Sequence, residues 1–187
     1  VYAAPPVNAL PTGESVVSGS ASFDRSIVNQ LMVNQSTSKL ISNWNSFDIG
    51  SAATVNFVQP DTASIALNRV ISASPTEIFG QLNANGQIFI VNPAGITFGL
   101  GSQANTGALL ASAMSISDAN FLNNNLTFER NGSRGQINNL GTLTASEGNV
   151  VFLGPTLQNQ RSIQSVKGNI LMGNGDKLKV ADHNLSL

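Results

Sequence analysis

Short apolar segments alternate with polar turns along most of the chain. Strands are predicted at residues 54–58, 65–71, 78–82 and 87–91. Asn, Gly and Pro mark the stretches that follow, so residues 83–86 and 92–95 are predicted to be turns. Helical periodicity is weak, and its best candidate is residues 117–125, where Ser117 and Asp118 can begin a short helix. Short strands separated by polar turns predict an all-β fold.

An internal repeat makes this prediction more specific. Residues 137–154 align with residues 157–174 at an offset of about 20 residues, and Gly, Asn and apolar positions all match. Residues 86–93 align with residues 148–155 at about three times that offset. Strand-rich repeats of this length are typical of a β-solenoid, whose rungs pair with equivalent strands above and below at about 4.8 Å. We expect about six or seven rungs over residues 54–187, with alternate side chains in a narrow core.

The two ends of the expected stack differ. Residues 13–42 fit the repeat poorly, so we expect residues 1–42 to form an N-terminal segment with a β cap over the first rung. The β-helix rungs are expected from about residue 43 to residue 187. Residues 177–187 show no comparable cap. We therefore interpret residues 1–187 as one domain and as the first part of a longer solenoid.

Composition excludes several classes of function. Charged residues make up only 10% of the chain and the net charge is -1, which argues against the concentrated basic surface of a nucleic-acid-binding protein. Cysteine is absent, which excludes disulfides, thiolate catalysis and cysteine-based zinc sites. The longest strongly apolar run, residues 88–91, is far shorter than the ~20 residues that span a bilayer. A cysteine-free, weakly charged chain that begins with Val1 suggests an exported protein.

Residues suited to catalysis or metal binding are few. The one histidine, His183, lies near the C-terminus, and the acidic residues are scattered along the chain. A β-helix enzyme that cleaves glycans needs paired carboxylates with a basic residue, and Asp61 with Arg69 is the nearest candidate. Arg69 is expected to brace a loop or turn instead, and residues 99–101 are expected to form a turn. We therefore expect no enzyme activity, no metal site and no cofactor.

Several longer motifs occur in a specific order. They are WNSFDIG at 44–50, VNFVQP at 55–60, LNRV at 67–70, IFGQL at 78–82 and NGQIFIVNPAGI at 85–96, followed by LAS at 110–112, ISD at 116–118 and Phe121. With these motifs the chain, from about Leu10 onward, resembles the N-terminal secretion domain of two-partner secretion exoproteins, of the filamentous-haemagglutinin and high-molecular-weight-adhesin type. Two departures are present. The family's Asn-Pro-Asn-Gly motif carries Ala94 in place of its second Asn, and the family's Asn-Pro-Asn-Leu motif has no counterpart.

The resemblance implies a fold and a function. The fold would be a right-handed parallel β-helix with an N-terminal β cap and extra-helical hairpins. The function would be that of a monomeric secretion-targeting and folding-nucleating module, recognised by a cognate outer-membrane transporter with periplasmic POTRA domains. It would direct an adhesin-like, haemolysin, haem-scavenging or toxin passenger through the periplasm of a Gram-negative bacterium to the surface or medium. The alternative function is a surface adhesin or binding module for host glycans or haem carriers.

The same motifs supply the candidate site residues. They are Gln59, Pro60, Asn68, Arg69, Asn85, Gly86, Asn92, Pro93 and Gly95. In residues 92–95, Pro at the second position and Gly at the fourth favour a type I β-turn. Two interpretations remain open for these residues: they shape the rungs, or they also contact the transporter.

Overall fold

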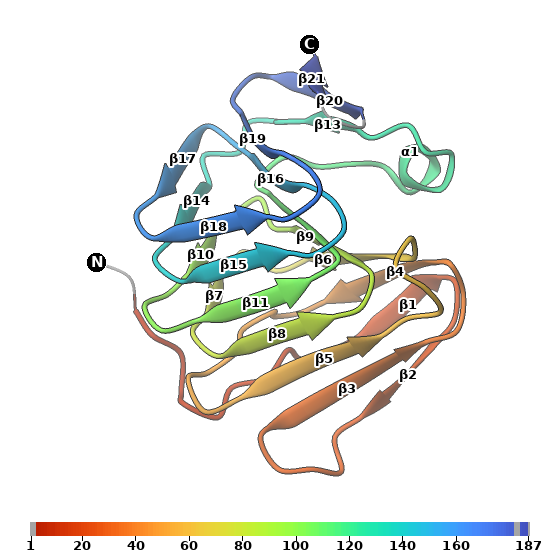
Figure 1. The fold of residues 1–187 in the computed structure, drawn as a ribbon, viewed down its shortest axis with the longest axis vertical. Helices are drawn as coiled ribbons and strands as arrows, with labels where there is room; N and C mark the ends of the chain where they lie inside the picture. Colours follow the sequence, from red (N-terminus) through yellow and green to blue (C-terminus); the bar gives the residue numbers. More distant parts are fainter. Residues whose placement is uncertain (1–2, 182–183, 187) are drawn as a thin grey trace.

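The computed structural model describes residues 3–181 and 184–186, which wind into a right-handed parallel β-helix. Its axis is vertical in Figure 1, and the chain climbs from the N-terminal strands at the bottom to the C-terminal strands at the top. Three sheets form the sides of the helix, and an outer sheet of three strands lies beside it. The predicted solenoid is confirmed. None of the described helical residues forms a segment long and apolar enough to cross a membrane.

Each of the three sides of the β-helix is a sheet of strands stacked along the axis. In spatial order, the first sheet contains β1 (Ser15–Ser18), β4 (Lys39–Trp44), β6 (Ile65–Val70), β9 (Gln87–Val91), β12 (Ala108–Ser112), β16 (Val150–Leu153) and β19 (Ile170–Gly173). The second contains β18 (Ser162–Ser165), β15 (Thr142–Ala145), β11 (Gln103–Thr106), β8 (Gln81–Ala84), β5 (Thr54–Val58), β3 (Gln30–Gln35) and β2 (Ala21–Asp24). The third contains β17 (Thr156–Asn159), β14 (Gln136–Asn139), β10 (Ile96–Phe98) and β7 (Thr76–Ile78), and the outer sheet β13 (Thr127–Glu129), β20 (Lys177–Ala181) and β21 (Asn184–Ser186). One rung consists of β8, β9 and β10.

The strand register confirms the shorter repeat and corrects the longer one. Val150 pairs with Ile170, so the offset between residues 137–154 and 157–174 is one rung. Ile88 pairs with Leu109 and Leu109 with Val150, so the longer offset is two rungs and not three. The second of these rungs is long because the chain leaves the stack between β12 and β14 to form α1 (Asp118–Leu122) and β13. An insertion outside the stack lengthens the repeat without disturbing the pairing inside it.

Helix α1 forms where the sequence predicts it. Ser117 precedes its first residue with an extended backbone, and its side chain accepts a hydrogen bond from the Asn120 N–H at 3.1 Å. This contact satisfies one of the free amide groups at the start of the helix.

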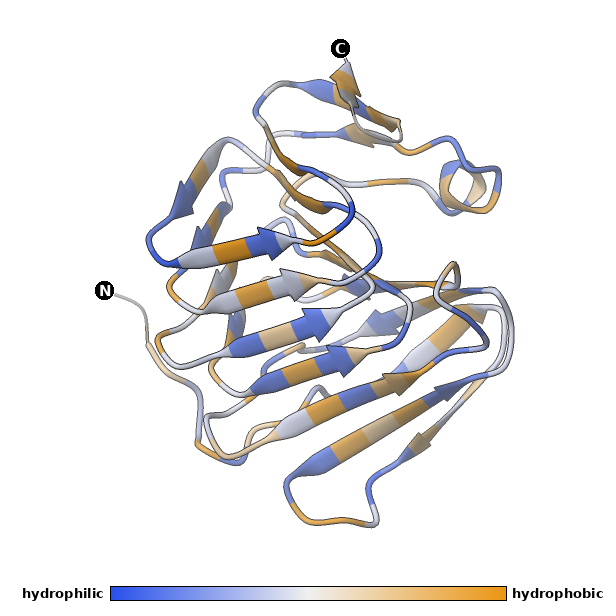
Figure 2. Cartoon of the chain, viewed as in Figure 1, coloured by the Kyte–Doolittle hydropathy of each residue, from blue (hydrophilic) through white to orange (hydrophobic). Residues whose placement is uncertain are grey.

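Alternate side chains of the strands form a continuous core inside the β-helix. Ile88 and Ile90 of β9 point into it and are fully buried. Figure 2 shows the alternation of apolar and polar residues along the strands of the second sheet. Near the N-terminal end, the Trp44 ring packs edge-on against Phe23 and Phe47, with ring centroids 5.6 and 5.4 Å away. Packed aromatic rings therefore fill the core at its first rungs.

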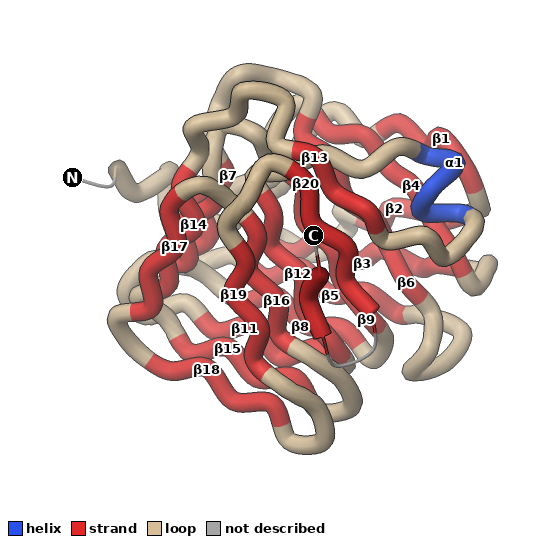
Figure 3. The backbone as a smooth tube through the Cα atoms, turned by 90° about the horizontal axis from the view of Figure 1, so that it is seen from above, coloured by secondary structure: helices blue, strands red, loops and turns tan. Residues whose placement is uncertain are grey.

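A second apolar cluster lies outside the β-helix, on the outer face of the first sheet. Phe89, Leu110 and Val151 belong to it and are buried. Phe121 of α1 and Phe128 of β13 cover them. Figure 3 shows α1 and the outer sheet on this side of the helix when it is viewed along its axis. The uniformly apolar run in β9 is explained by burial on both of its faces.

Strands β1 and β2 lie at the N-terminal end, where the cap is predicted. They pair antiparallel with β4 and β3, whereas the strands of the rungs pair in parallel. Parallel pairing begins at Gln30, which pairs with Thr54. The rungs therefore start before residue 43, the boundary expected from the sequence.

The prediction of a single strand at residues 78–82 is wrong. β7 ends at Ile78 and β8 begins at Gln81, because the chain turns between them. A Cβ on Gly80 would collide with the carbonyl oxygen of Gly50, so only glycine fits at this corner. The apolar side chains of this segment belong to two different sheets.

Strands β17, β18 and β19 form the last rung that the structure describes. β20 and β21 do not add another rung, because they pair antiparallel with β13 and with each other. Within residues 3–181 and 184–186, no strand pairs with the outer edges of β17, β18 and β19. The C-terminal end of the described stack thus presents free strand edges.

Candidate functional site

The first group of candidate residues lies at the corner where the chain passes from the second sheet to the first. β8 continues to Ala84, so the turn predicted at residues 83–86 is confined to Asn85 and Gly86. The Gln59 N–H donates to Asn85 Oδ1, and Asn85 Nδ2 donates to the Gln59 carbonyl, both at 2.8 Å. The Gly86 N–H donates to Gln59 Oε1 at 2.9 Å. These three residues join two rungs.

The corner network extends one rung further, to a residue that the sequence reasoning missed. Buried Gln59 donates through Nε2 to Gln35 Oε1 at 3.1 Å. Gln35 in turn donates through Nε2 to the Thr37 carbonyl at 2.7 Å. The sequence contained a signal for this contact, because Gln35 and Gln59 each come directly after the last paired residue of β3 and β5. Pro60 follows this corner and is exposed.

The two candidate residues of β6 point in opposite directions. Asn68 points inward, is fully buried, and accepts a hydrogen bond from Trp44 Nε1 at 3.0 Å. Arg69 points outward and forms an ion pair with Asp118 at 2.8 Å, while its Nη2 donates to the Ile116 carbonyl at 2.9 Å. Arg69 therefore braces the loop before α1.

The structure does not bring Asp61 and Arg69 together as a catalytic pair. Asp61 caps its own turn, where its Oδ1 accepts hydrogen bonds from Ser64 Oγ at 2.9 Å and the Ala63 N–H at 3.1 Å. Within residues 3–181 and 184–186, no group of three or more His, Cys, Asp and Glu side chains is placed to hold a metal ion. His183 lies outside the described residues.

The second group of candidate residues lies at the corner between the first and third sheets. The Gly95 N–H donates to the Asn92 carbonyl at 2.9 Å, and the positive φ falls on Gly95, as expected after a type I turn. Buried Asn92 donates through Nδ2 to the Ser74 carbonyl at 2.9 Å and to Thr76 Oγ1 at 3.0 Å. Asn92 thus joins this turn to the preceding rung, while Pro93 is exposed.

The candidate residues do not form one continuous site. β9 separates the corner at Gly86 from the corner at Asn92. Most of the candidate side chains make internal hydrogen bonds, and the exposed members are Pro60, Asn85 and Pro93. The geometry shows how these residues hold rungs together, and their contact with a transporter stays a prediction.

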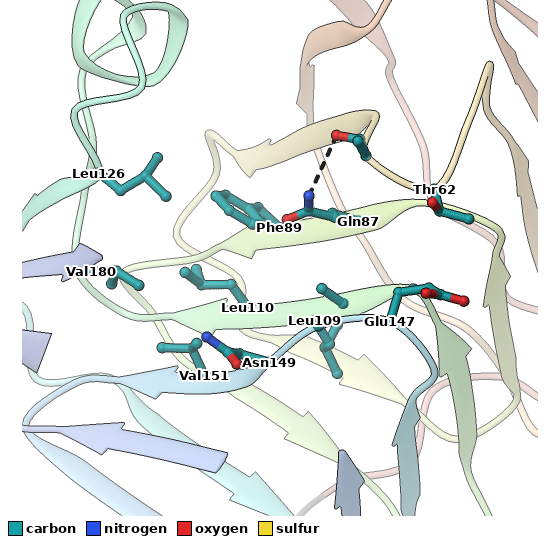
Figure 4. Close-up of a pocket in the computed structure, with 14 residues that line it drawn as sticks. Thr62, Gln87, Phe89, Leu109, Leu110, Leu126, Glu147, Asn149, Val151 and Val180 are labelled. Atoms are coloured by element: carbon teal, nitrogen blue, oxygen red, sulfur yellow. Dashed lines mark hydrogen bonds between the residues drawn. The ribbon is translucent and has the colours of Figure 1, made fainter. Parts of the chain in front are cut away.

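A groove of about 460 Å³ lies on the outer face of the first sheet. Phe89, Leu110 and Val151 form its apolar floor, and Leu126 and Val180 from the outer elements form one wall (Figure 4). Polar residues lie at the opposite side, where Gln87 Nε2 donates to the Ala63 carbonyl at 3.4 Å. The sequence reasoning missed this groove, because the wall comes from the insertion and from β20.

Two carboxylates are close together on the outer face of the third sheet. Burial raises the pKa of Glu77 to about 7, and the negative charge of Asp48 adds to the effect. Burial also raises the pKa of Asp48, although its Oδ1 accepts a hydrogen bond from the Glu77 N–H at 2.8 Å. The sequence reasoning missed this pair, because it regarded the acidic residues as scattered.

The fold is a parallel β-helix with an antiparallel cap, corners joined by Asn and Gln side chains, and an outer sheet that covers one face. The family model of the TPS secretion domain matches residues 7–186. The chain belongs to this family, whose exoproteins are secreted by two-partner secretion in Gram-negative bacteria.

Two solved structures are similar to the chain. The secretion domain of HMW1 from Haemophilus influenzae superimposes with a TM-score of 0.89 and 32% sequence identity, over 95% of this chain and 49% of that chain. The secretion domain of filamentous hemagglutinin gives a TM-score of 0.65 and 15% identity, over 95% and 67% of the two chains, which shows a shared fold.

Two curated relatives, both from Haemophilus influenzae, are named heme/hemopexin-binding protein. One is 40% identical over 102 residues and the other 31% identical over 121 residues. The matches cover 54% and 65% of this chain but only 11% and 13% of the relatives. The chain therefore corresponds to a small part of each relative.

Proposed function

We propose that the chain targets a larger exoprotein for secretion and nucleates its folding, and that a cognate outer-membrane transporter with periplasmic POTRA domains recognises it. The observation that carries the proposal is the match to the TPS secretion domain over residues 7–186. The similarity to the HMW1 secretion domain over 95% of the chain supports it. The passenger would be an adhesin-like protein or a toxin that follows this domain.

The burial of the candidate residues indicates whether the transporter recognises the chain in its folded or in its extended state. Gln59, Asn68 and Asn92 are almost completely buried, and their amide groups are hydrogen bonded between rungs. A folded domain cannot offer these groups to a partner without breaking its rungs. The transporter therefore binds the chain while the chain is extended in the periplasm. The extended chain adds as a strand to the edge of a sheet in the periplasmic domains of the transporter.

Folding outside the cell gives the movement its direction. The free edges of β17, β18 and β19 can pair with a following rung, so the completed rungs act as a template. Each rung that forms outside must unfold before the chain slides back, which biases transport outward without ATP. The absence of cysteine fits this route, because no disulfide-closed loop would obstruct threading.

Binding to the purified periplasmic domains of the transporter tests the proposal. We expect those domains to bind the chain held unfolded in dilute urea, and to bind the folded chain at least about tenfold more weakly. Fluorescence anisotropy of the labelled chain measures both affinities, and a cysteine-free segment of similar composition from an unrelated protein is the control. Absence of binding in both states would refute recognition by these domains.

A second candidate function is a binding module for haem carriers or host glycans. The names of the two curated relatives favour it, and the groove with its apolar floor offers a surface of suitable size. Binding of the folded chain to hemopexin, haem and a glycan array separates this function from the first. Saturable binding that a Leu126→Glu substitution on the half-buried wall of the groove abolishes would support the second function, provided that circular dichroism shows the variant to be folded.

A further inference from the structure

Asparagine is followed by glycine at Asn85, Asn131 and Asn174. An Asn-Gly pair is prone to spontaneous deamidation, because glycine has no side chain to hinder the attack of its own backbone nitrogen on the asparagine side chain. The structure holds the reacting groups of these pairs in different ways. Their hydrogen bonds therefore predict which pair reacts in the folded protein.

Asn131 and Gly132 form the exposed tip of a turn in the loop between β13 and β14. Their φ angles are 50° and 77°, and the Ser133 N–H donates to the Arg130 carbonyl at 2.9 Å, which is the pattern of a type I′ turn. Within residues 3–181 and 184–186, neither the Asn131 side chain nor the Gly132 N–H has a hydrogen-bond partner. A Cβ on Gly132 would meet no atom within 4 Å. Both reacting groups are thus free and open to solvent.

The other two Asn-Gly pairs are held more firmly. The Asn85 side chain makes two hydrogen bonds of 2.8 Å to the main chain of Gln59, and the Gly86 N–H donates to Gln59 Oε1 at 2.9 Å. Asn174 is intermediate, because its Nδ2 donates to the Pro155 carbonyl at 3.0 Å. These bonds must break before either asparagine can react, so both are expected to react more slowly than Asn131.

We propose that Asn131 is a site of spontaneous deamidation in the folded protein, with water as the only co-reactant. The Gly132 nitrogen loses its proton and attacks Cγ of Asn131. A nitrogen–carbon bond forms, the bond between Cγ and Nδ2 breaks, and the side-chain nitrogen takes up a proton and leaves as ammonia. Water then opens the resulting succinimide ring, which gives aspartate or isoaspartate at residue 131.

Closure of the ring requires the Asn131 backbone to leave its left-handed conformation. This rotation breaks the hydrogen bond from the Ser133 N–H to the Arg130 carbonyl, and the one from Arg130 Nε to the Ser133 carbonyl at 2.8 Å. Both bonds belong to a turn with an exposed tip, where water can replace them at little cost. Gln59, which holds Asn85 and Gly86, is buried instead, so its bonds are costlier to break.

The loop that carries Asn131 is docked on the turn at residues 92–95. Ser133 Oγ donates to the Pro93 carbonyl at 2.7 Å, and a Cβ on Gly135 would come within 2.5 Å of the same oxygen. Isoaspartate adds one atom to the main chain, so it changes the turn that positions Ser133. Deamidation therefore adds a negative charge to this loop and, in the isoaspartate form, loosens its contact with the turn at residues 92–95.

Prolonged incubation of the whole chain at neutral to mildly alkaline pH, followed by peptide mapping with mass spectrometry, tests the proposal. In the folded chain, Asn131 is expected to deamidate at least about tenfold faster than Asn85, with Asn174 between them. In concentrated guanidinium chloride the rates are expected to agree within about threefold, because the hydrogen bonds that separate them are lost. The rate at Asn131 should rise with pH, since the attacking nitrogen must lose its proton.

Two variants make the test specific. Asn131→Gln keeps the amide but would have to close a larger ring, so most of the more acidic form of the chain should be missing on anion-exchange chromatography. Asn174→Gln is the matched control at another exposed asparagine, and it should leave most of the acidic form unchanged.

Amide hydrogen exchange on the separated isoaspartate form tests the consequence for the loop. Exchange is expected to accelerate in residues 92–95 and 130–136 and to stay unchanged in β18. Unchanged exchange in residues 92–95 would show that the contact between the loop and the turn is not loosened.

Two results would overturn the assignment of Asn131. The first is an equal rate of deamidation at Asn131 and Asn85 in the folded chain. The second is the same spread of rates in guanidinium chloride as in the folded chain, because the selectivity would then come from the sequence and not from the fold.

Discussion

The outer faces of the first and second sheets are built from the same rungs but differ in what covers them. On the first sheet, Phe89 and Leu110 point outward and are buried under α1 and the outer sheet. On the second sheet, Asn83 and Asn105 point outward and are partly or fully exposed. The comparison teaches that a β-helix face is covered where its outward positions are apolar, since the rung geometry itself is the same on both.

The uncovered face of the second sheet holds a ladder of amide side chains. Asn83 Nδ2 donates to Asn56 Oδ1 at 3.0 Å, and Asn105 Nδ2 donates to Asn83 Oδ1 at 3.4 Å. Such exposed bonds compete with water and contribute little to the free energy of unfolding. The covered face contributes far more, because it removes large apolar side chains from water.

The largest effect is expected from a charge on the covered face. Leu110→Asp should lower the free energy of unfolding by about 3 kcal/mol or more, because it buries a carboxylate without a partner. Asn105→Asp on the uncovered face should change it by less than about 0.5 kcal/mol. Urea unfolding followed by the fluorescence of Trp44 measures both. Similar losses in the two variants would contradict the difference between the faces.

The next largest effect is expected from removing part of the cover. Phe121 packs edge-on against Phe89 with ring centroids 5.9 Å apart, so Phe121→Ala should cost about 3 kcal/mol. Amide hydrogen exchange should accelerate in α1 and β13 and stay unchanged in β15 and β18 of the second sheet. A uniform acceleration along the chain would show that the cover is not a separate layer.

The outer face of the third sheet should make stability depend on pH. The pKa of Glu77 rises from 4.5 to about 7 on folding, so the folded chain holds this proton more tightly than the unfolded chain. The contribution of Glu77 should be most favourable below about pH 4.5 and should be lost as the pH rises towards 7. Urea midpoints between pH 5 and 8 should fall in the wild-type chain and fall less in Glu77→Gln. An equal fall of the urea midpoint with pH in the wild-type chain and in Glu77→Gln would contradict the assignment of this pH dependence to Glu77.

The smallest effect is expected from the amide ladder. Asn83→Ala removes two hydrogen bonds from the uncovered face but should change the free energy of unfolding by less than about 0.5 kcal/mol. A loss above about 1 kcal/mol would show that the ladder stabilises the second sheet as a unit. The same urea titration decides between these results.

The sequence predicts the rungs well where they repeat without interruption. Between residues 137 and 174 the residues in equivalent positions pair as the alignment predicts. The longer alignment is miscounted because the insertion after β12 has about the length of one rung, and length alone cannot distinguish the two. The outer sheet that covers the first sheet could not be predicted from the sequence, because β13 pairs with β20, which lies far from it along the chain.

The candidate site is predicted only in part, for a physical reason. The polar residues of the motifs stand at corners, as Gln59 and Asn92 show, and corner geometry follows from local turn chemistry. The pair of Asp48 and Glu77 depends instead on the register that places Ile49 beside Ile78. The sequence alone contains no signal for that arrangement until the register is known.

Secretion of the full-length exoprotein by cells that express its transporter tests the central claim most directly. The double variant Ile88→Asp, Ile90→Asp places two carboxylates in the core of an early rung, whereas the control Val58→Asp places one carboxylate at a position whose side chain is 50% exposed. We predict that the amount of exoprotein in the medium falls at least about tenfold in the double variant and is unchanged in Val58→Asp. Normal secretion of the double variant would contradict the claim that stacking of these rungs drives export.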